Sequence, residues 1–369
     1  SVSSCDRIID KLGDNIFVIT DADLTKIELN KPIINQISKS SNLEVFDDVE
    51  SDPSKKTLIK ALKSAKNFKP TGILGFGGGS SMDIAKLVSL LMGTKQDIDN
   101  IWGVGNAKGP RLPLVLVPTT AGTGSEVTPI SIITLEDNEK KGVSTPIILP
   151  DLAVLDPELT LNLPSDITAA TGVDAMVHAI EAYTSINQNN NPISKLLAIE
   201  ALKLLGSSIE TAVFDGQNIE ARKNMLLGSM MAGQAFANSP VSAVHALAYP
   251  IGGIFHIPHG LSNSLILPHV LKFNSINPKA CEQYAFLAPF IFKDINLKTN
   301  NQIICNEFIE RLENLSSLLN IPSKLRDIDI PKEACAKMAK ESMKQTRLLV
   351  NNPREVTEED AFNIYNAAW

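Results

Sequence analysis

The first part of the chain alternates short apolar runs with helical patterns, and this alternation limits the possible folds most strongly. The runs that we interpret as buried strands lie at residues 15–20, 43–46, 72–76 and 112–117. Helical patterns at 55–67 and 82–92 fit between them. Strands that alternate with helices are typical of a parallel, doubly wound sheet. We therefore predict an α/β domain, with extra strands at 130–134 and 141–149.

Beyond Asp156-Pro157 the strand signals give way to long helical patterns. They lie at residues 169–184, 192–205, 219–238 and 300–319. A chain of 369 residues is also too long for one typical hydrophobic core. We predict two domains, an α/β domain at 1–157 and an all-helical domain at 158–369, with the linker near 156–163.

Composition excludes several classes of function. The net charge of −7, without a basic run interleaved with aromatic residues, argues against nucleic acid as a partner. The four cysteines are scattered and form no C-x-x-C pair, which is typical of reduced thiols in a cytoplasmic protein. No apolar run is long enough to span a membrane, and no signal peptide is visible. We expect a cytoplasmic protein that acts on a small molecule.

A glycine-rich turn follows the third expected strand. Gly77, Gly78, Gly79 and Ser80 connect that strand to the next helix. In a parallel sheet, glycines at this place let the backbone approach a pyrophosphate, and the helix N-terminus attracts its negative charge. The turn is not a G-x-G-x-x-G fingerprint, because Ser80 occupies the last glycine position, and it lacks the G-K-[ST] of a Walker A loop. A simple strand–helix turn with a serine cap is the alternative.

A second loop of small and hydroxyl residues, 118–129, follows the fourth expected strand. It contributes Thr119, Thr120, Thr123 and Thr128, whose hydroxyls suit a ribose, a phosphate or a nicotinamide amide. An ordinary capped turn is the alternative, but the loop is long and unusually rich in hydroxyls. Two such loops at adjacent strand ends favour a dinucleotide.

Asp21 follows the first expected strand. A carboxylate at this place can accept a hydrogen bond from a ribose 2′-hydroxyl, which would favour NAD over NADP. An aspartate that only caps the following helix explains the same residue equally well.

The distribution of histidines points to a metal site. The chain has five histidines, and four of them lie between His245 and His269. The fifth, His178, follows Asp174 by four residues in a helical pattern, so both side chains lie on one helix face. With His245 and His259, they make a plausible four-ligand set for a divalent transition metal. A surface Asp/His pair and ordinary buried histidines are the alternative interpretation.

These segments together resemble the iron-containing (group III) alcohol dehydrogenases. The resemblance includes the glycine turn, 118–126, 172–183 and 245–259, and extends to 149–158 and 351–360, so that it covers nearly the whole chain. It implies a Rossmann-like α/β domain that binds the dinucleotide and an all-helical domain that binds the metal, as in dehydroquinate synthase. It also implies an active-site cleft between the two domains and a homodimer or larger homo-oligomer.

The resemblance also implies roles for individual residues. It implies metal ligation by Asp174, His178, His245 and His259. It implies cofactor contacts by Asp21, Gly78, Gly79, Ser80, Thr119, Thr120, Thr128 and a lysine at Lys140 or Lys141. To these we add Gly77 and Thr123, from the same two loops. The metal expected from the family is Fe²⁺, although Zn²⁺ suits the same ligands.

Four features depart from the family pattern. The chain starts where the first strand of the family would end. Tyr249 and His256 stand where many members carry His and Asn, and Asp52 precedes a proline where relatives often have Asn. We predict that His256 and Tyr249 pass a proton to solvent; a wall of the active-site cleft is the alternative role for His256.

The predicted activity is reversible hydride transfer between a small primary alcohol and NAD, with the metal acting as a Lewis acid on the substrate oxygen. A hydroxy-acid dehydrogenase or a hydride transhydrogenase of the same family is an alternative. A cyclase or lyase of the dehydroquinate synthase type is less favoured, because segments 168–182 and 241–267 contain no Lys or Arg for a phosphorylated substrate. A non-catalytic protein is disfavoured by the four intact candidate ligands.

Overall fold

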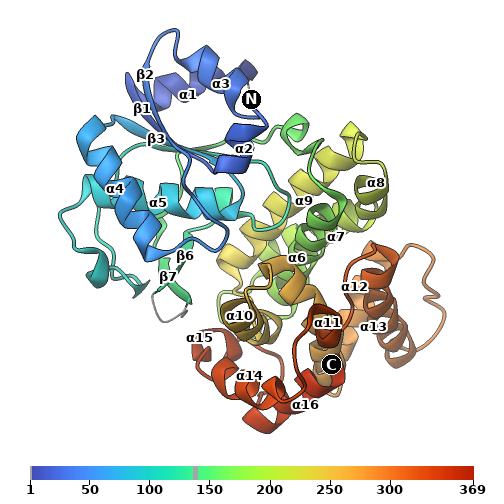
Figure 1. The fold of residues 1–369 in the computed structure, drawn as a ribbon. Coiled ribbons are helices and arrows are strands. Elements are labelled where there is room, and N and C mark those ends of the chain that lie inside the picture. Colours follow the sequence, from blue (N-terminus) through green and yellow to red (C-terminus); the bar gives the residue numbers. More distant parts are fainter. Residues whose placement is uncertain (1, 136–139) are drawn as a thin grey trace. The chain divides into compact units, whose positions relative to one another are not determined.

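The computed structural model describes residues 2–135 and 140–369, and the chain divides into two compact units. The α/β unit consists of residues 1–120 and 124–160, and the helical unit of 121–123 and 161–369. In Figure 1 the α/β unit runs from blue to green and the helical unit from green to red.

The α/β unit is built on a five-stranded parallel sheet with the order β2-β1-β3-β5-β8. The strands are β1 (Asn15–Ile19), β2 (Asn42–Phe46), β3 (Gly72–Gly77), β5 (Leu114–Pro118) and β8 (Leu152–Ala153). The helices of this unit are α1 (Cys5–Leu12), α2 (Ala22–Lys26), α3 (Lys31–Ile37), α4 (Lys55–Phe68) and α5 (Gly79–Gly93). The predicted parallel α/β fold is confirmed.

Helices cover both faces of this sheet, because alternate strand residues point in opposite directions. Phe17 and Ile19 of β1 belong to the core that includes α4 and α5. Ile16 and Val18, on the other face, belong to the core that includes α1 and α3. Both faces of the central strands are therefore buried, as their unbroken apolar sequence predicts.

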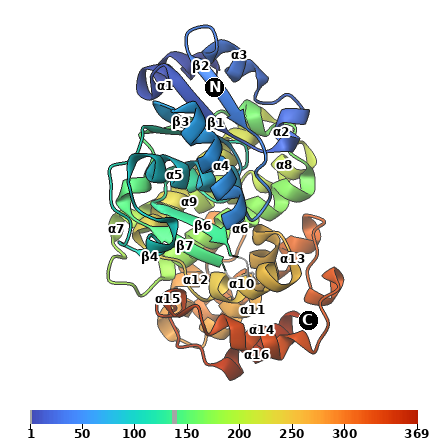
Figure 2. The same cartoon turned by 60° about the vertical axis from the view of Figure 1, so that its left-hand side comes forward.

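A smaller sheet contains β4 (Gly103–Val104), β6 (Ile130–Thr134) and β7 (Lys140–Ser144), in the order β4-β7-β6 (Figure 2). The predicted strand at 130–134 is confirmed. The predicted strand at 141–149 is wrong beyond Ser144, since Pro146–Ile148 forms a short 3₁₀ helix. Proline has no N–H to donate to a sheet and begins such turns readily, which explains the early end.

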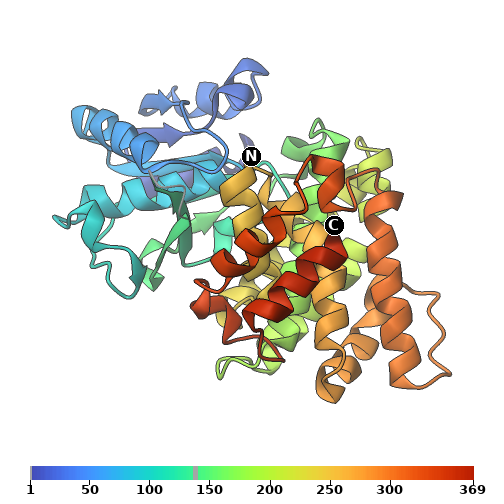
Figure 3. The same cartoon turned by 60° about the horizontal axis from the view of Figure 1, so that its bottom comes forward.

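The helical unit is formed by α6 (Ser165–Thr184) and the helices that follow it in the chain. They are α7 (Pro192–Gly206), α8 (Ile209–Phe214), α9 (Ile219–Asn238), α10 (Ala243–Phe255), α11 (His259–Asn274), α12 (Pro278–Ile291), α13 (Asn301–Leu318), α14 (Ala334–Ser342), α15 (Thr346–Leu349) and α16 (Glu358–Ala368). Helices α12 and α13 lie side by side, as do α14 and α16 (Figure 3). The predicted all-helical architecture is confirmed.

Helix α6 is central to this unit and is buried along most of its length. It packs against α7, α9 and α11. Gly260, in the first turn of α11, lets this helix approach α6 closely, since a Cβ atom there would lie 2.5 Å from the carbonyl oxygen of Ala170. Only glycine fits this contact, and the contact places the start of α11 against Ala170 and Asp174 of α6.

Within the part of the chain that the structure describes, we find no helix with the length and apolar character needed to cross a membrane.

Candidate metal centre

Three helices of the helical unit bring the four predicted ligands together. Asp174 and His178 lie one turn apart on α6, His245 lies in the first turn of α10, and His259 is the first residue of α11. One candidate ligand atom from each residue lies within 4.8 Å of the other three. The predicted spatial cluster is therefore present.

The connection between α10 and α11 presents His259 to this cluster. His256 is the C-cap of α10 and has the left-handed conformation, with φ of 56°, and Pro258 is the N-cap of α11. Among non-glycine residues, His and Asn adopt this conformation more readily than most. The close packing of Gly260 on α6 then fixes the first turn of α11 beside Asp174.

Two buried imidazole nitrogen atoms of the cluster, one on His178 and one on His245, lack hydrogen-bond partners. The Nε2 atoms of His245 and His259 lie 3.9 and 3.8 Å from Oδ1 of Asp174. Both Nε2 of His245 and Nδ1 of His178 are buried without a hydrogen-bond partner. An unsatisfied buried polar atom is costly, and a bound cation satisfies lone pairs that face one point. The donor set thus fits a divalent metal.

Burial also favours the uncharged form of His178. It is 4% exposed and stacks on His245 with ring centroids 4.7 Å apart. Desolvation, and to a lesser degree the neighbouring His245, hold the pKa of His178 well below its ordinary value. A neutral imidazole keeps the lone pair that a metal requires.

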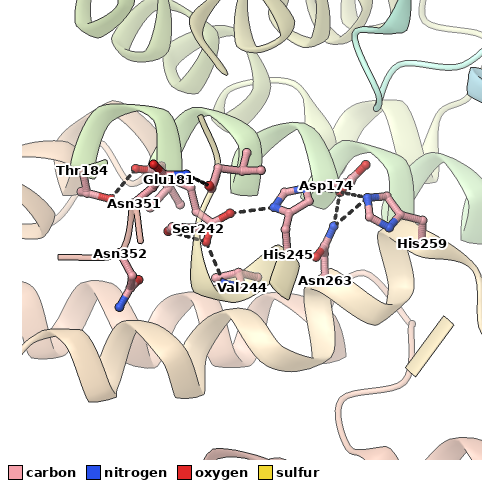
Figure 4. Close-up of polar contacts among 12 residues, drawn as sticks. Asp174, Glu181, Thr184, Ser242, Val244, His245, His259, Asn263, Asn351 and Asn352 are labelled. Atoms are coloured by element: carbon pink, nitrogen blue, oxygen red, sulfur yellow. Dashed lines mark hydrogen bonds and ion pairs between the residues drawn. The ribbon is translucent and has the colours of Figure 1, made fainter. Parts of the chain in front are cut away.

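Two further buried side chains hold the cluster in place, and the sequence had not indicated either of them (Figure 4). Asn263 Nδ2 lies 2.6 Å from Oδ1 of Asp174 and 3.2 Å from Nε2 of His259. Glu181 Oε2 lies 2.6 Å from Nδ1 of His245. Burial raises the pKa of Glu181, but the hydrogen bonds with His245 and Ser242 outweigh burial, so that the pKa is lowered. Helical spacing from Asp174 to Glu181 and from His259 to Asn263 was the available signal.

One side of the cluster is more accessible than the rest. The His259 side chain is 29% exposed, whereas the side chains of Asp174 and His245 are 2% and 3% exposed. The Tyr249 ring lies 6.1 Å from the His259 ring, centroid to centroid. His256 is exposed at the end of α10. A small molecule can therefore approach the cluster from the side of His259 and Tyr249.

In the α/β unit, the predicted dinucleotide residues gather where adjacent parallel strands end. Gly77 has φ of 151°, and a Cβ atom there would lie 3.4 Å from Oδ2 of Asp21 and 2.7 Å from Oγ of Ser81. A Cβ at Gly78 would lie 3.6 Å from the Thr120 side chain. The turn does connect β3 directly to α5, but the serine cap expected in the alternative interpretation is wrong, since Gly78 is the N-cap and Gly79 and Ser80 are already helical.

Asp21 does cap a helix: its Oδ1 accepts a hydrogen bond from the backbone N–H of Leu24 at 2.9 Å. Burial raises its pKa. The capping interpretation is confirmed, and the carboxylate also lies beside the glycine turn, so capping does not exclude a ribose contact.

The remaining predicted cofactor residues have partners within the chain. Thr119 is buried, and its N–H donates to the carbonyl of Gly77. Thr128 Oγ1 accepts from the buried Lys86, which the sequence interpretation missed. Lys140 pairs with Asp52 at 2.7 Å. Thr123 groups with the helical unit.

Comparison with known proteins assigns both units of the chain to the same family. The family model "Iron-containing alcohol dehydrogenase" matches residues 1–157, and the model "Fe-containing alcohol dehydrogenase family, C-terminal" matches residues 168–369. A long-chain-alcohol dehydrogenase of Geobacillus thermodenitrificans is 38% identical over 98% of this chain and 91% of its own length.

Solved structures are similar over the full length. An alcohol dehydrogenase from Oenococcus oeni has a TM-score of 0.94 at 32% identity, covering 100% of this chain and 96% of that one. A sulfoacetaldehyde reductase from Bifidobacterium kashiwanohense, solved in complex with NAD⁺, has a TM-score of 0.87 at 28% identity, again covering 100% and 96%. Family models and relatives thus agree on the same assignment, and the chain belongs to the iron-containing alcohol dehydrogenase family.

Proposed function

We propose that this chain is a metal-dependent, NAD-linked dehydrogenase that interconverts a small primary alcohol and its aldehyde. The observation that carries the proposal is the buried cluster of Asp174 and three histidines, with ligand atoms within 4.8 Å of one another. Membership of the iron-containing alcohol dehydrogenase family supports the reaction type.

Asp174, His178, His245 and His259 would hold the metal. One carboxylate and three imidazoles suit Fe²⁺, which the family name favours, and also Zn²⁺. A metal at this place supplies a Lewis acid that polarises an alcohol or carbonyl oxygen. Asn263 and Glu181 keep Asp174 and His245 oriented toward the centre of the cluster.

The carboxyl ends of β1, β3 and β5 would hold NAD, which accepts or returns the hydride. The backbone N–H groups at the N-terminus of α5 would bind the pyrophosphate, and the small residues of the turn leave them accessible: Gly77, Gly78, Gly79 and Ser80. Asp21 would accept from the ribose, and Thr119, Thr120 and Thr123 would contact the rest of the cofactor. Thr128 already binds Lys86, and Lys140 already pairs with Asp52, so these two residues would contact the cofactor in addition to those partners. The NAD⁺ complex of the Bifidobacterium relative supports this choice of cofactor.

The surroundings of the cluster favour a small, mostly uncharged substrate. Segments 168–182 and 241–267, which carry all four candidate ligands, contain no Lys or Arg. A carboxylate or phosphate on the substrate would therefore find no cation on these segments, which disfavours a hydroxy acid or a cyclase substrate. Tyr249 borders the accessible side at His259, and the exposed His256 can exchange a proton with solvent.

The direct test measures metal content and NAD reduction on the same preparation, purified without oxygen. We expect about one Fe or Zn per chain, reduction of NAD with short primary alcohols, and loss of activity with a chelator that added Fe²⁺ or Zn²⁺ reverses. Bound metal with activity only on hydroxy acids would move the assignment to another dehydrogenase of the family. A protein that reduced NAD fully without metal would overturn the proposal.

We also propose that the chain acts as a homodimer or a larger homo-oligomer. The basis is the family resemblance. Light scattering coupled to size-exclusion chromatography tests it, and a mass of one chain at micromolar concentration would contradict it.

A further inference from the structure

Glu181 makes a set of contacts that joins α6 to the start of α10. It is 2% exposed and lies one turn beyond His178 on α6. Its Oε1 accepts from the hydroxyl of Ser242 at 2.8 Å and from the N–H of Val244 at 2.7 Å. Its Oε2 lies 2.6 Å from Nδ1 of His245 (Figure 4). One carboxylate therefore binds both the first turn of α10 and the candidate ligand in that turn.

We propose that Glu181 is a positioning residue for the metal: it fixes the tautomer and orientation of His245 so that the Nε2 lone pair faces the other three ligands. This inference rests on the proposed metal site, and its test is chosen so that the two can fail separately.

The hydrogen-bond inventory of the site requires this arrangement. A carboxylate only accepts hydrogen bonds, so Nδ1 of His245 must carry the proton that points at Oε2. Neutral imidazole then has its lone pair on Nε2, the atom that is buried without a partner and lies 3.9 Å from Oδ1 of Asp174. The opposite tautomer would place a buried N–H donor at that point, where it would repel a cation. Carboxylates that hold metal-binding histidines in this way raise metal affinity by about tenfold to a hundredfold.

A purely structural role for Glu181, as a cap for α10, makes a different prediction for Glu181→Gln. The glutamine amide has one acceptor end and one donor end. With its oxygen toward Ser242 and Val244, both capping bonds survive, and the NH₂ group faces Nδ1 of His245. That orientation keeps the helix cap but forces the proton of His245 onto Nε2. The reverse orientation would set the NH₂ group against the N–H of Val244 and lose the cap.

The experiment compares wild type, Glu181→Gln and Ser242→Ala. Ser242→Ala is the matched control, because it removes one hydrogen bond to Oε1 and leaves the contact with His245 intact. Dissociation constants for Zn²⁺ and Co²⁺ come from competition with a chelator. The tautomer of His245 comes from ¹⁵N spectra of histidine-labelled, metal-free protein, which are tractable with five histidines. Chemical denaturation of the metal-free protein measures how much the cap of α10 contributes to the free energy of unfolding.

We expect Glu181→Gln to weaken Zn²⁺ and Co²⁺ binding by about tenfold to a hundredfold, with His245 shifted to the Nε2–H form and the stability of the metal-free protein kept. Ser242→Ala should bind both metals within about threefold of wild type and keep the Nδ1–H form. Unchanged metal affinity in Glu181→Gln, or an Nε2–H tautomer in the wild type, would overturn the inference. Failure of the wild type to bind either metal would overturn the proposed function, while the tautomer would still decide the role of Glu181.

Discussion

The Nζ atom of Lys86 lies 2.8 Å from the Oγ atom of Ser125, inside the α/β unit. The same ammonium group donates to Thr128 Oγ1 and to the carbonyl of Ile130, and it is 3.8 Å from Asp83. Asp83 in turn accepts from the Ser125 hydroxyl. Helix α5, which begins at the glycine turn, is thus joined to the hydroxyl-rich loop by the buried Lys86 and the half-buried Asp83.

Replacing Lys86 by Met should destabilise the protein strongly. Methionine fills a similar volume but leaves Asp83, Ser125, Thr128 and the Ile130 carbonyl without their buried donor. Removing one partner of a buried charged pair typically costs about 3–5 kcal/mol. Chemical denaturation of the metal-free protein measures this loss. Lys56→Met, at an exposed position of α4, is the control and should change stability by less than about 0.5 kcal/mol. Equal stability of the two variants would contradict the role of Lys86.

Glu126 should make stability depend on pH in the acid range. Burial raises the pKa of Glu126 from 4.5 to about 7, and its Oε1 is buried without a hydrogen-bond partner. Because the pKa of Glu126 is higher in the folded state, the folded protein favours the neutral, protonated carboxyl group. The contribution of this neutral group to the free energy of unfolding is complete below pH 4.5 and is lost as pH rises through 7. Glu126→Gln removes this term. We expect the variant to match the wild type near pH 4.5 and to become relatively more stable toward pH 8, in denaturation curves recorded across that range. A difference between the two that does not vary with pH would argue against the raised pKa.

Metal binding should stabilise the helical unit. A ligand at one hundred times its dissociation constant adds about 2.7 kcal/mol to the free energy of unfolding. We expect added Zn²⁺ to raise the melting temperature of the wild type and a chelator to lower it again. His178→Ala should lose the response to Zn²⁺. His269→Ala, which changes another histidine on α11 outside the cluster, should keep it. An equal response from both variants would mean that Zn²⁺ binds elsewhere.

Asp21 should control the choice between NAD and NADP. Its carboxylate lies beside the glycine turn, where it would repel a 2′-phosphate. Asparagine keeps the cap of α2, since Asn and Asp are equivalent N-caps, and removes only the charge. We expect Asp21→Asn to shift the ratio of kcat/KM values toward NADP by about tenfold, or ~1.4 kcal/mol. A ratio that did not move would limit Asp21 to its capping role.

The features that could be predicted from the sequence are those that local patterns determine, whereas contacts made by the packing of distant segments could not be predicted. Asp174 and His178 could be paired because helical spacing alone puts them on one face. Strands β1, β3 and β5 were visible as buried apolar runs, whereas the two-residue strand β8 left no such signal and was missed. Glu181 and Asn263 were missed because their contacts depend on how α10 and α11 pack on α6. The Lys86 contacts depend in the same way on the path of a loop.

Anomalous diffraction from a crystal of the Zn²⁺-loaded protein, measured at the zinc absorption edge, tests the central claim most directly. We predict one strong peak per chain, within about 2.0–2.2 Å of an Asp174 oxygen and of one nitrogen from each of His178, His245 and His259. A peak bound by other residues, or no peak after loading with Zn²⁺, would contradict the assignment of these four residues as the metal centre.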